Sequence, residues 1–144
     1  MSEPVTGSCN CGGVTFSITG PLRSVVACHC GQCRKQTGLY YAATDVADEQ
    51  LTFESDDTLK WYAASDTAKR GFCGECGSAL FWKANGSGKT SILVGSLNGD
   101  AGGIKLERHI FTADKGAFYE LNDGLPCYEQ DDAHNPRPEP DRSM

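Results

Sequence analysis

Short stretches that alternate between apolar and polar residues recur along the chain, and this period of two predicts β-strands. Residues 14–19 (VTFSIT) alternate strictly, with the turn signals Gly12-Gly13 before them and Gly20-Pro21 after them. Further short strands are expected at residues 24–27, 39–43, 51–54, 59–62, 79–82, 91–94 and 106–112. The polar residues at 45–50 and 55–58 are expected to connect strands.

One segment departs from this pattern and predicts a helix. Residues 31–37 contain no β-branched run, and Gly38 after them can take the left-handed conformation that ends a helix. Residues 85–88 (NGSG) predict a hairpin turn. The expected fold is therefore mainly β, with small antiparallel sheets and one short helix. We assign residues 1–129 to a single domain and the polar, proline-rich residues 130–144 to a flexible or loosely docked tail.

The composition adds a reason to expect bound metal. Only 39% of the 144 residues are hydrophobic and 17 are glycine, so the core is lean and metal crosslinks are expected to help hold the fold. The net charge of -6 disfavours nucleic acid as a partner, because domains that bind it usually carry a basic excess. A local basic patch at Arg34, Lys35, Lys69 and Arg70 can still attract a small anion.

The sequence carries no sign of export or of membrane insertion. Residues 1–4 form neither a basic region nor an apolar run, and no segment approaches the ~18 apolar residues of a membrane span. We therefore expect a cytoplasmic protein whose cysteines stay reduced. A secreted disulfide framework fits poorly, since Cys9 and Cys11 would then need separate partners elsewhere in the chain.

Seven of the eight cysteines lie in three tight clusters, and only Cys127 stands apart. The clusters are CxC at Cys9 and Cys11, CxCxxC at Cys28, Cys30 and Cys33, and CxxC at Cys73 and Cys76. Thiols this close in sequence reach one metal ion more easily than they close an unstrained disulfide. On extended chain Cys28 and Cys30 share a face, and His29 between them points to the opposite face. We expect His29 and His109 to pack or hydrogen-bond rather than to bind metal.

These seven cysteines divide into a set of four and a set of three. The triplet supplies three ligands locally, which leaves Cys9, Cys11, Cys73 and Cys76 to clamp the N-terminal segment to a later turn. Four cysteines form a closed structural zinc site, whereas three leave a position for water or substrate. We therefore expect two zinc sites, and the sequence leaves open whether the second is occupied at rest.

The chemistry of the open site follows from its ligands. A zinc ion with three thiolate ligands is a weak Lewis acid, so it suits a soft ligand such as a substrate thiol better than it suits activation of water. A fourth thiolate adds negative charge, and Arg34 and Lys35 directly after the triplet are candidate charge partners. The alternative for both is an exposed, solvated helix face.

Several motifs together resemble the glutathione-dependent formaldehyde-activating enzyme family, to which centromere protein V is related. They are GSCNCGGV at 7–14, CHCGQCRK at 28–35, FCGECG at 72–77, GSLN at 95–98, HI at 109–110 and DGLP at 123–126. The resemblance implies a β-rich fold shared with the mammalian suppressor of secretion proteins. It also implies a structural zinc at Cys9, Cys11, Cys73 and Cys76 and a catalytic zinc at Cys28, Cys30 and Cys33.

In the family's reaction, glutathione and formaldehyde combine to S-(hydroxymethyl)glutathione, a carbon–sulfur bond-forming step classed with the lyases. The expected function is accordingly a zinc-dependent carbon–sulfur lyase that acts on a small thiol and an aldehyde, glutathione and formaldehyde by default. The alternative is a non-catalytic zinc-binding module for a protein partner or a thiol metabolite. The oligomeric state does not follow from the sequence.

Overall fold

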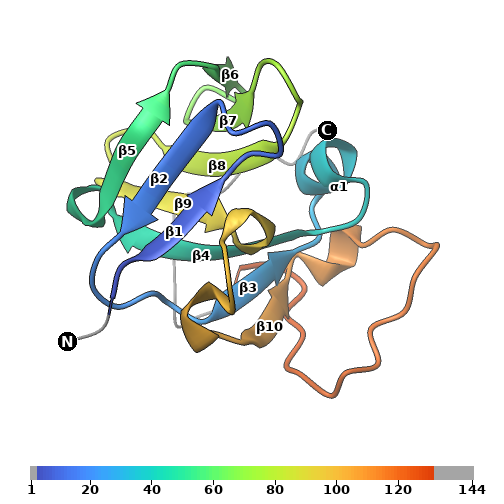
Figure 1. The fold of residues 1–144 in the computed structure, drawn as a ribbon. Coiled ribbons are helices and arrows are strands. Elements are labelled where there is room, and N and C mark those ends of the chain that lie inside the picture. Colours follow the sequence, from blue (N-terminus) through green and yellow to red (C-terminus); the bar gives the residue numbers. More distant parts are fainter. Residues whose placement is uncertain (1–2, 132–144) are drawn as a thin grey trace.

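The computed structural model describes residues 3–131, and within them ten strands and one α-helix form the fold (Figure 1). The strands are β1 Val5–Ser8, β2 Val14–Ile18, β3 Val25–Cys28, β4 Tyr41–Ala47, β5 Leu51–Asp56, β6 Leu59–Ala63, β7 Ala68–Cys73, β8 Ala79–Ala84, β9 Lys89–Leu93 and β10 Leu106–Ile110. The helix α1 spans Gly31–Thr37. Four 3-10 turns complete the set: η1 Asp48–Gln50, η2 Val94–Ser96, η3 Ala101–Gly103 and η4 Thr112–Asp114.

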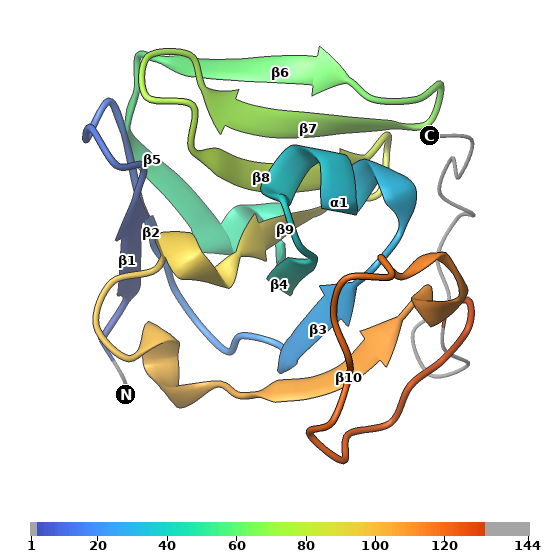
Figure 2. The same ribbon diagram turned by 90° about the vertical axis from the view of Figure 1, so that its right-hand side faces the viewer.

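The strands form two sheets. A 3-stranded sheet has the order β1-β2-β5, and a 7-stranded sheet has the order β10-β3-β4-β9-β8-β7-β6. Figure 2 shows the larger sheet from β6 at the top to β10 at the bottom, with α1 over the strands between them. All pairs of strands are antiparallel except β3 with β10, which is parallel.

The main core is a cluster of apolar side chains contributed by strands of both sheets. Strand β2 alternates between buried and half-buried positions, so Val14, Phe16 and Ile18 all turn inward. The ring of Phe16 meets that of Phe81 on β8 edge to face, with centroids 5.3 Å apart. Burying one such aromatic side chain contributes about 1.5–3 kcal/mol. A second, smaller cluster surrounds the cysteine triplet and includes Val26, Tyr41 and Ile110.

Most of the expected elements are confirmed, including the mainly β architecture and the helix at residues 31–37. Gly38 ends α1 with φ 88°, the left-handed conformation that the sequence predicts. The expectation of a polar connection from residue 45 is wrong, because β4 continues to Ala47. Asp45 pairs with Ser91 in the ladder, and its carboxylate accepts a hydrogen bond from the Ser91 hydroxyl. The carboxylate of Asp45 therefore has a hydrogen-bond partner within the sheet.

Two further expectations concern the C-terminal tail and membrane insertion. The expected tail at 130–144 falls mostly on residues 132–144, which lie outside the described residues. Within the described part, the backbone N–H of Phe111 donates to the carbonyl of Gln130 at 3.0 Å. Among residues 3–131, no helix has the length and apolar character needed to cross a membrane.

Candidate metal centre

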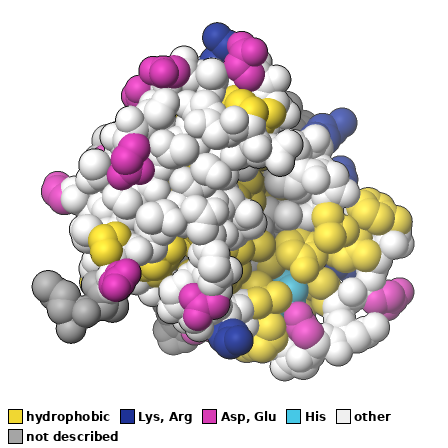
Figure 3. Space-filling view, in the orientation of Figure 1, with side chains coloured by type: hydrophobic (Ala, Val, Ile, Leu, Met, Phe, Trp, Pro, Cys, Tyr) yellow, Lys and Arg dark blue, Asp and Glu magenta, His cyan; other side chains and the backbone are white. Residues whose placement is uncertain are grey.

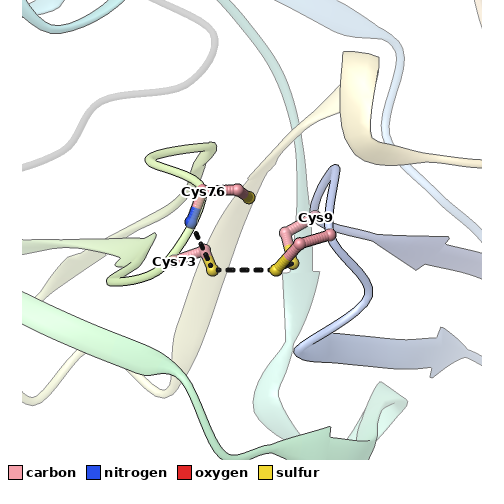
Figure 4. A group of neighbouring side chains, drawn as sticks. Cys9, Cys73 and Cys76 are labelled. Atoms are coloured by element: carbon pink, nitrogen blue, oxygen red, sulfur yellow. Dashed lines mark hydrogen bonds between the residues drawn. The ribbon is translucent and has the colours of Figure 1, made fainter.

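Four cysteines from two separate turns meet at the edge of the core. Cys9 and Cys11 lie in the turn between β1 and β2, and Cys73 and Cys76 lie at the turn between β7 and β8. Their four Sγ atoms all lie within 4.8 Å of one another. Figure 4 shows Cys9, Cys73 and Cys76 pointing toward a common centre. The structure therefore brings together the four cysteines that the sequence groups as a closed site.

The sulfur separations in this four-cysteine cluster fit a tetrahedral metal site. Cys9 Sγ and Cys11 Sγ are 3.7 Å apart, and so are Cys11 Sγ and Cys73 Sγ. Four thiolates at about 2.3 Å from a zinc ion would be about 3.8 Å apart along each edge of the tetrahedron. The described residues form no disulfide. The donor set thus fits a soft divalent ion such as zinc.

Local hydrogen bonds favour negative charge on two of these sulfurs, those of Cys73 and Cys76. The backbone N–H groups of Glu75 and Cys76 donate to Cys73 Sγ at 3.3 Å and 3.4 Å. Hydrogen bonds from the Ser78 side chain and backbone lower the pKa of Cys76 to about 5. Gly77 has φ 82°, a conformation that lets the turn aim its N–H groups at the sulfurs. A thiolate stabilised in this way is the form that binds metal.

The second group of thiols is built on a single short stretch of chain. Cys28 ends β3, Cys30 caps the N-terminus of α1, and Cys33 lies in the first turn of that helix. The backbone N–H of Cys33 donates to Cys30 Sγ at 3.4 Å, which closes this turn. The three Sγ atoms also lie within 4.8 Å of one another. Within residues 3–131 no histidine or carboxylate joins them, so a metal held here keeps an open position.

The three thiols cannot all ionise without a cation beside them. Hydrogen bonds from Cys28 and Cys33 lower the pKa of Cys30, and the positive charge of Arg70 acts in the same direction. Hydrogen bonds with Cys30 and Cys33, together with burial, raise the pKa of Cys28 well above its usual value. A divalent ion would remove this mutual repulsion. The triplet therefore fits a metal ion on chemical grounds as well as by geometry.

A small pocket of about 40 Å³ opens beside the triplet. Its walls are Arg23, Val26, Cys28, Cys30, Cys33, Tyr41, Ala43, Arg70, Trp82 and Ser91. Cys28 is half-buried, whereas Cys30 and Cys33 are buried. This volume accommodates a molecule of a few heavy atoms beside the thiols. A long substrate can place only its reacting end here.

Arg70 on β7 is the basic side chain that contacts the triplet directly. Its Nη2 donates to Cys33 Sγ at 3.4 Å, and the side chain is almost fully buried. Its Nε donates to Gln32 Oε1 at 3.2 Å and its Nη1 to Gln36 Oε1 at 2.8 Å, both on α1. The guanidinium also lies over the ring of Tyr41, 5.3 Å from the ring centroid. The charge is thus held against the thiols by three hydrogen bonds and one aromatic face.

Arg34 and Lys35, the charge partners expected from the sequence, lie away from the pocket beside the triplet. Arg34 Nη1 donates to the carbonyl of Asp114 at 3.0 Å, and Lys35 is exposed. Neither lines the pocket beside the triplet. The sequence does include Arg70 in its basic patch, but no local signal shows that β7 places this residue across from Cys33. That contact depends on the pairing of strands distant in sequence.

A chain of hydrogen bonds runs behind the triplet, on the opposite face of β3. His29 Nδ1 and the Tyr119 hydroxyl are 2.6 Å apart, His29 Nε2 and His109 Nδ1 are 2.9 Å apart, and His109 Nε2 and Asp123 Oδ2 are 2.8 Å apart. Because the carboxylate accepts, each group donates toward Asp123: the tyrosine to His29, and His29 to His109. His29 thus points away from the metal thiols, as the alternation of the strand predicts.

This chain lies beneath an exposed hydrophobic area. Figure 3 shows hydrophobic side chains gathered around a histidine, on the side where α1 and the segment after β10 lie. Phe118 is 64% exposed. The ring of Phe118 packs edge to face on Tyr119, with centroids 5.0 Å apart. The hydrogen-bonded chain therefore fastens the segment after β10 to the back of the strand that carries Cys28.

Comparison with known proteins agrees with this geometry. The model of the glutathione-dependent formaldehyde-activating enzyme family matches residues 4–114, a range that includes all seven clustered cysteines. The chain belongs to this family. No curated protein matches it. The crystal structure of a Rhodobacter sphaeroides protein is similar with a TM-score of 0.57 and 23% sequence identity, over 70% of this chain and 98% of that one. At that identity the likeness concerns the fold alone.

Proposed function

We propose that this member of the family combines a thiol with an aldehyde at the Cys28–Cys30–Cys33 site, as a zinc-dependent carbon–sulfur lyase. The observation that carries the proposal is a group of three thiols, in the wall of a pocket of about 40 Å³, that could hold a metal ion with one position left open. The matching family model supports glutathione and formaldehyde as the expected pair. A one-carbon aldehyde suits so small a pocket, while most of a tripeptide thiol has to lie outside it.

The two groups of cysteines take different parts in this proposal. Cys9, Cys11, Cys73 and Cys76 hold a structural zinc, and Cys28, Cys30 and Cys33 hold the second one. When bound at the triplet, zinc offers a coordination position that favours the ionised form of a substrate thiol. Arg34 and Lys35 stay candidate charge partners for parts of an anionic thiol that lie outside the pocket.

The atoms of the reaction balance without an oxidant or a reductant. The thiol sulfur forms a bond to the aldehyde carbon, and the π electrons of the carbonyl move to its oxygen. That oxygen takes up one proton, which balances the proton released by the thiol. The pocket walls formed by Val26, Ala43 and Trp82 hold the aldehyde close to the sulfur and keep competing water out.

The test is the rate of adduct formation and breakdown. Exchange between ¹³C-formaldehyde and its glutathione adduct is measured by NMR exchange spectroscopy, with and without the protein. We expect the zinc-loaded protein to accelerate exchange and a Cys28→Ala, Cys30→Ala, Cys33→Ala variant to lose that acceleration. Cys127→Ser is the matched control, because Cys127 is exposed and belongs to neither cluster.

The choice of thiol is part of the same experiment. Cysteine and coenzyme A are tested beside glutathione, since the cysteine frame alone does not select one thiol. An unchanged exchange rate with all three thiols, from a protein that holds two zinc ions, would refute the catalytic proposal. The non-catalytic zinc-binding module would then be the better description.

A further inference from the structure

Three thiolates can hold a divalent metal ion without a further cation beside them, so the contact between Arg70 and Cys33 is more than that task requires. Arg70 brings a buried positive charge to Cys33, yet a divalent ion alone already neutralises two of the three thiolate charges. A buried guanidinium is costly unless its hydrogen bonds are made. Here Gln32, Gln36 and Cys33 accept one bond each. The fold thus places a buried positive charge directly beside Cys33.

The contact between Arg70 and Cys33 can compensate the negative charge that a thiolate substrate would add to the site. Three thiolates and a divalent ion would carry one net negative charge, and a thiolate substrate as the fourth ligand would raise this to two. In a buried site that second charge is strongly unfavourable without a compensating cation. Hydrogen bonds from a cation to a thiolate sulfur withdraw charge from the site and are stronger than those from neutral donors.

We propose that Arg70 enables the Cys28–Cys30–Cys33 site to accept an anionic thiolate as a fourth ligand, by offsetting the added charge through its hydrogen bond to Cys33. This inference rests on the proposed function and adds a positioning residue to it. Arg70 acts through Cys33 and needs no contact with the aldehyde. The ligand class that it favours is a small anionic thiolate over a neutral donor.

The contacts of residue 70 require an arginine and could not all be made by a lysine. The planar fork reaches two glutamine side chains and one sulfur at once while its face lies over Tyr41. A lysine ammonium carries the same charge but cannot stack in this way or span all three acceptors. Arg70→Lys therefore tests the geometry with the charge kept, and Arg70→Gln tests the loss of charge.

The experiment uses cobalt in place of zinc, because the visible absorption of Co(II) reports its ligands directly. Cobalt-loaded full-length protein is titrated with glutathione, with β-mercaptoethanol and with imidazole, the last as a neutral donor. We expect Arg70→Gln to weaken binding of both thiols by roughly 10- to 100-fold, with imidazole binding changed by less than about 3-fold. Arg70→Lys is expected to fall between wild type and Arg70→Gln. Lys89→Gln is the matched control, since it removes one exposed positive charge that does not line the pocket.

The possible outcomes separate this inference from the proposed function. If thiols do not change the cobalt spectrum of the wild type, the proposed function fails and the inference fails with it. If the wild type binds thiols and Arg70→Gln binds them equally well, the inference alone is overturned. Equally weakened binding of thiols and of imidazole would also overturn it, because Arg70 would then maintain the structure of the site rather than compensate its charge. Loss of the triplet's cobalt from both Arg70 variants would overturn it as well, by placing the role of Arg70 in metal retention.

Discussion

The two cysteine groups are expected to differ sharply in what they contribute to folding. In the four-cysteine cluster, Cys11 and Cys73 are separated by 62 positions, so a shared metal ion would join two distant turns. A crosslink over such a loop removes about 4 kcal/mol of unfolded-state entropy. Apparent binding energies of structural zinc reach about 10–16 kcal/mol, against a total stability of about 5–15 kcal/mol for a typical domain. Replacing one of these ligands should therefore unfold the domain.

A metal ion at the triplet would close only a short local loop. Losing it therefore returns far less conformational entropy to the unfolded chain than losing the metal of the four-cysteine cluster. Replacing Cys28, Cys30 and Cys33 by alanine removes one sulfur atom from each, at about 1 kcal/mol per side chain. We expect the Cys73→Ala variant to lack a cooperative unfolding transition, and the triple variant to keep one at a lower urea midpoint. Circular dichroism and metal analysis on the same samples measure both properties.

The controls make this prediction refutable. Cys127→Ser should unfold like the wild type, since Cys127 is exposed and belongs to neither cluster. A Cys73→Ala variant with the urea midpoint of the wild type would show that the four-cysteine site is not a structural staple. An unfolded triple variant beside a folded Cys73→Ala variant would reverse the two assignments.

Three further predictions concern single side chains. Tyr119→Phe leaves its buried imidazole partner without a hydrogen-bond donor, so the free energy of unfolding should fall by about 1–3 kcal/mol, whereas Tyr62→Phe at an exposed position should change it little. Gly77→Ala should weaken metal retention against a chelator, because its φ of 82° strains any side chain, while Gly95→Ala, which has open space and no positive φ, should not. Alkylation of the metal-loaded protein should modify Cys127 first by mass spectrometry, and equal labelling of all cysteines would contradict metal protection of the clusters.

The sequence predicts the parts of the molecule that depend on neighbours along the chain. The alternation of β2, the end of α1 at Gly38 and the division of the cysteines into four and three all follow from local spacing. Contacts between distant strands do not follow from it. The parallel pairing of β10 with β3 joins residues about eighty positions apart, and nothing in either segment specifies the partner.

The charge partner of the triplet illustrates the same limit. Sequence proximity favours Arg34 and Lys35, but α1 directs Arg34 to the carbonyl of Asp114. Arg70 reaches Cys33 because β7 passes α1 in the folded chain. The strand β1 was not expected either, since its four residues give too short a pattern to recognise.

The compact layout of the triplet also bears on how the protein is made. Residues 28–33 leave the ribosome before Cys73 and Cys76, and all three cysteines of the triplet lie within these six residues. A nascent chain can therefore capture a metal ion at the triplet while Cys9 and Cys11 still wait for their partners. If both sites bind zinc as proposed, the order of metal loading would be the reverse of the order of structural need: the first ion would bind beside the pocket, and the second would complete the fold.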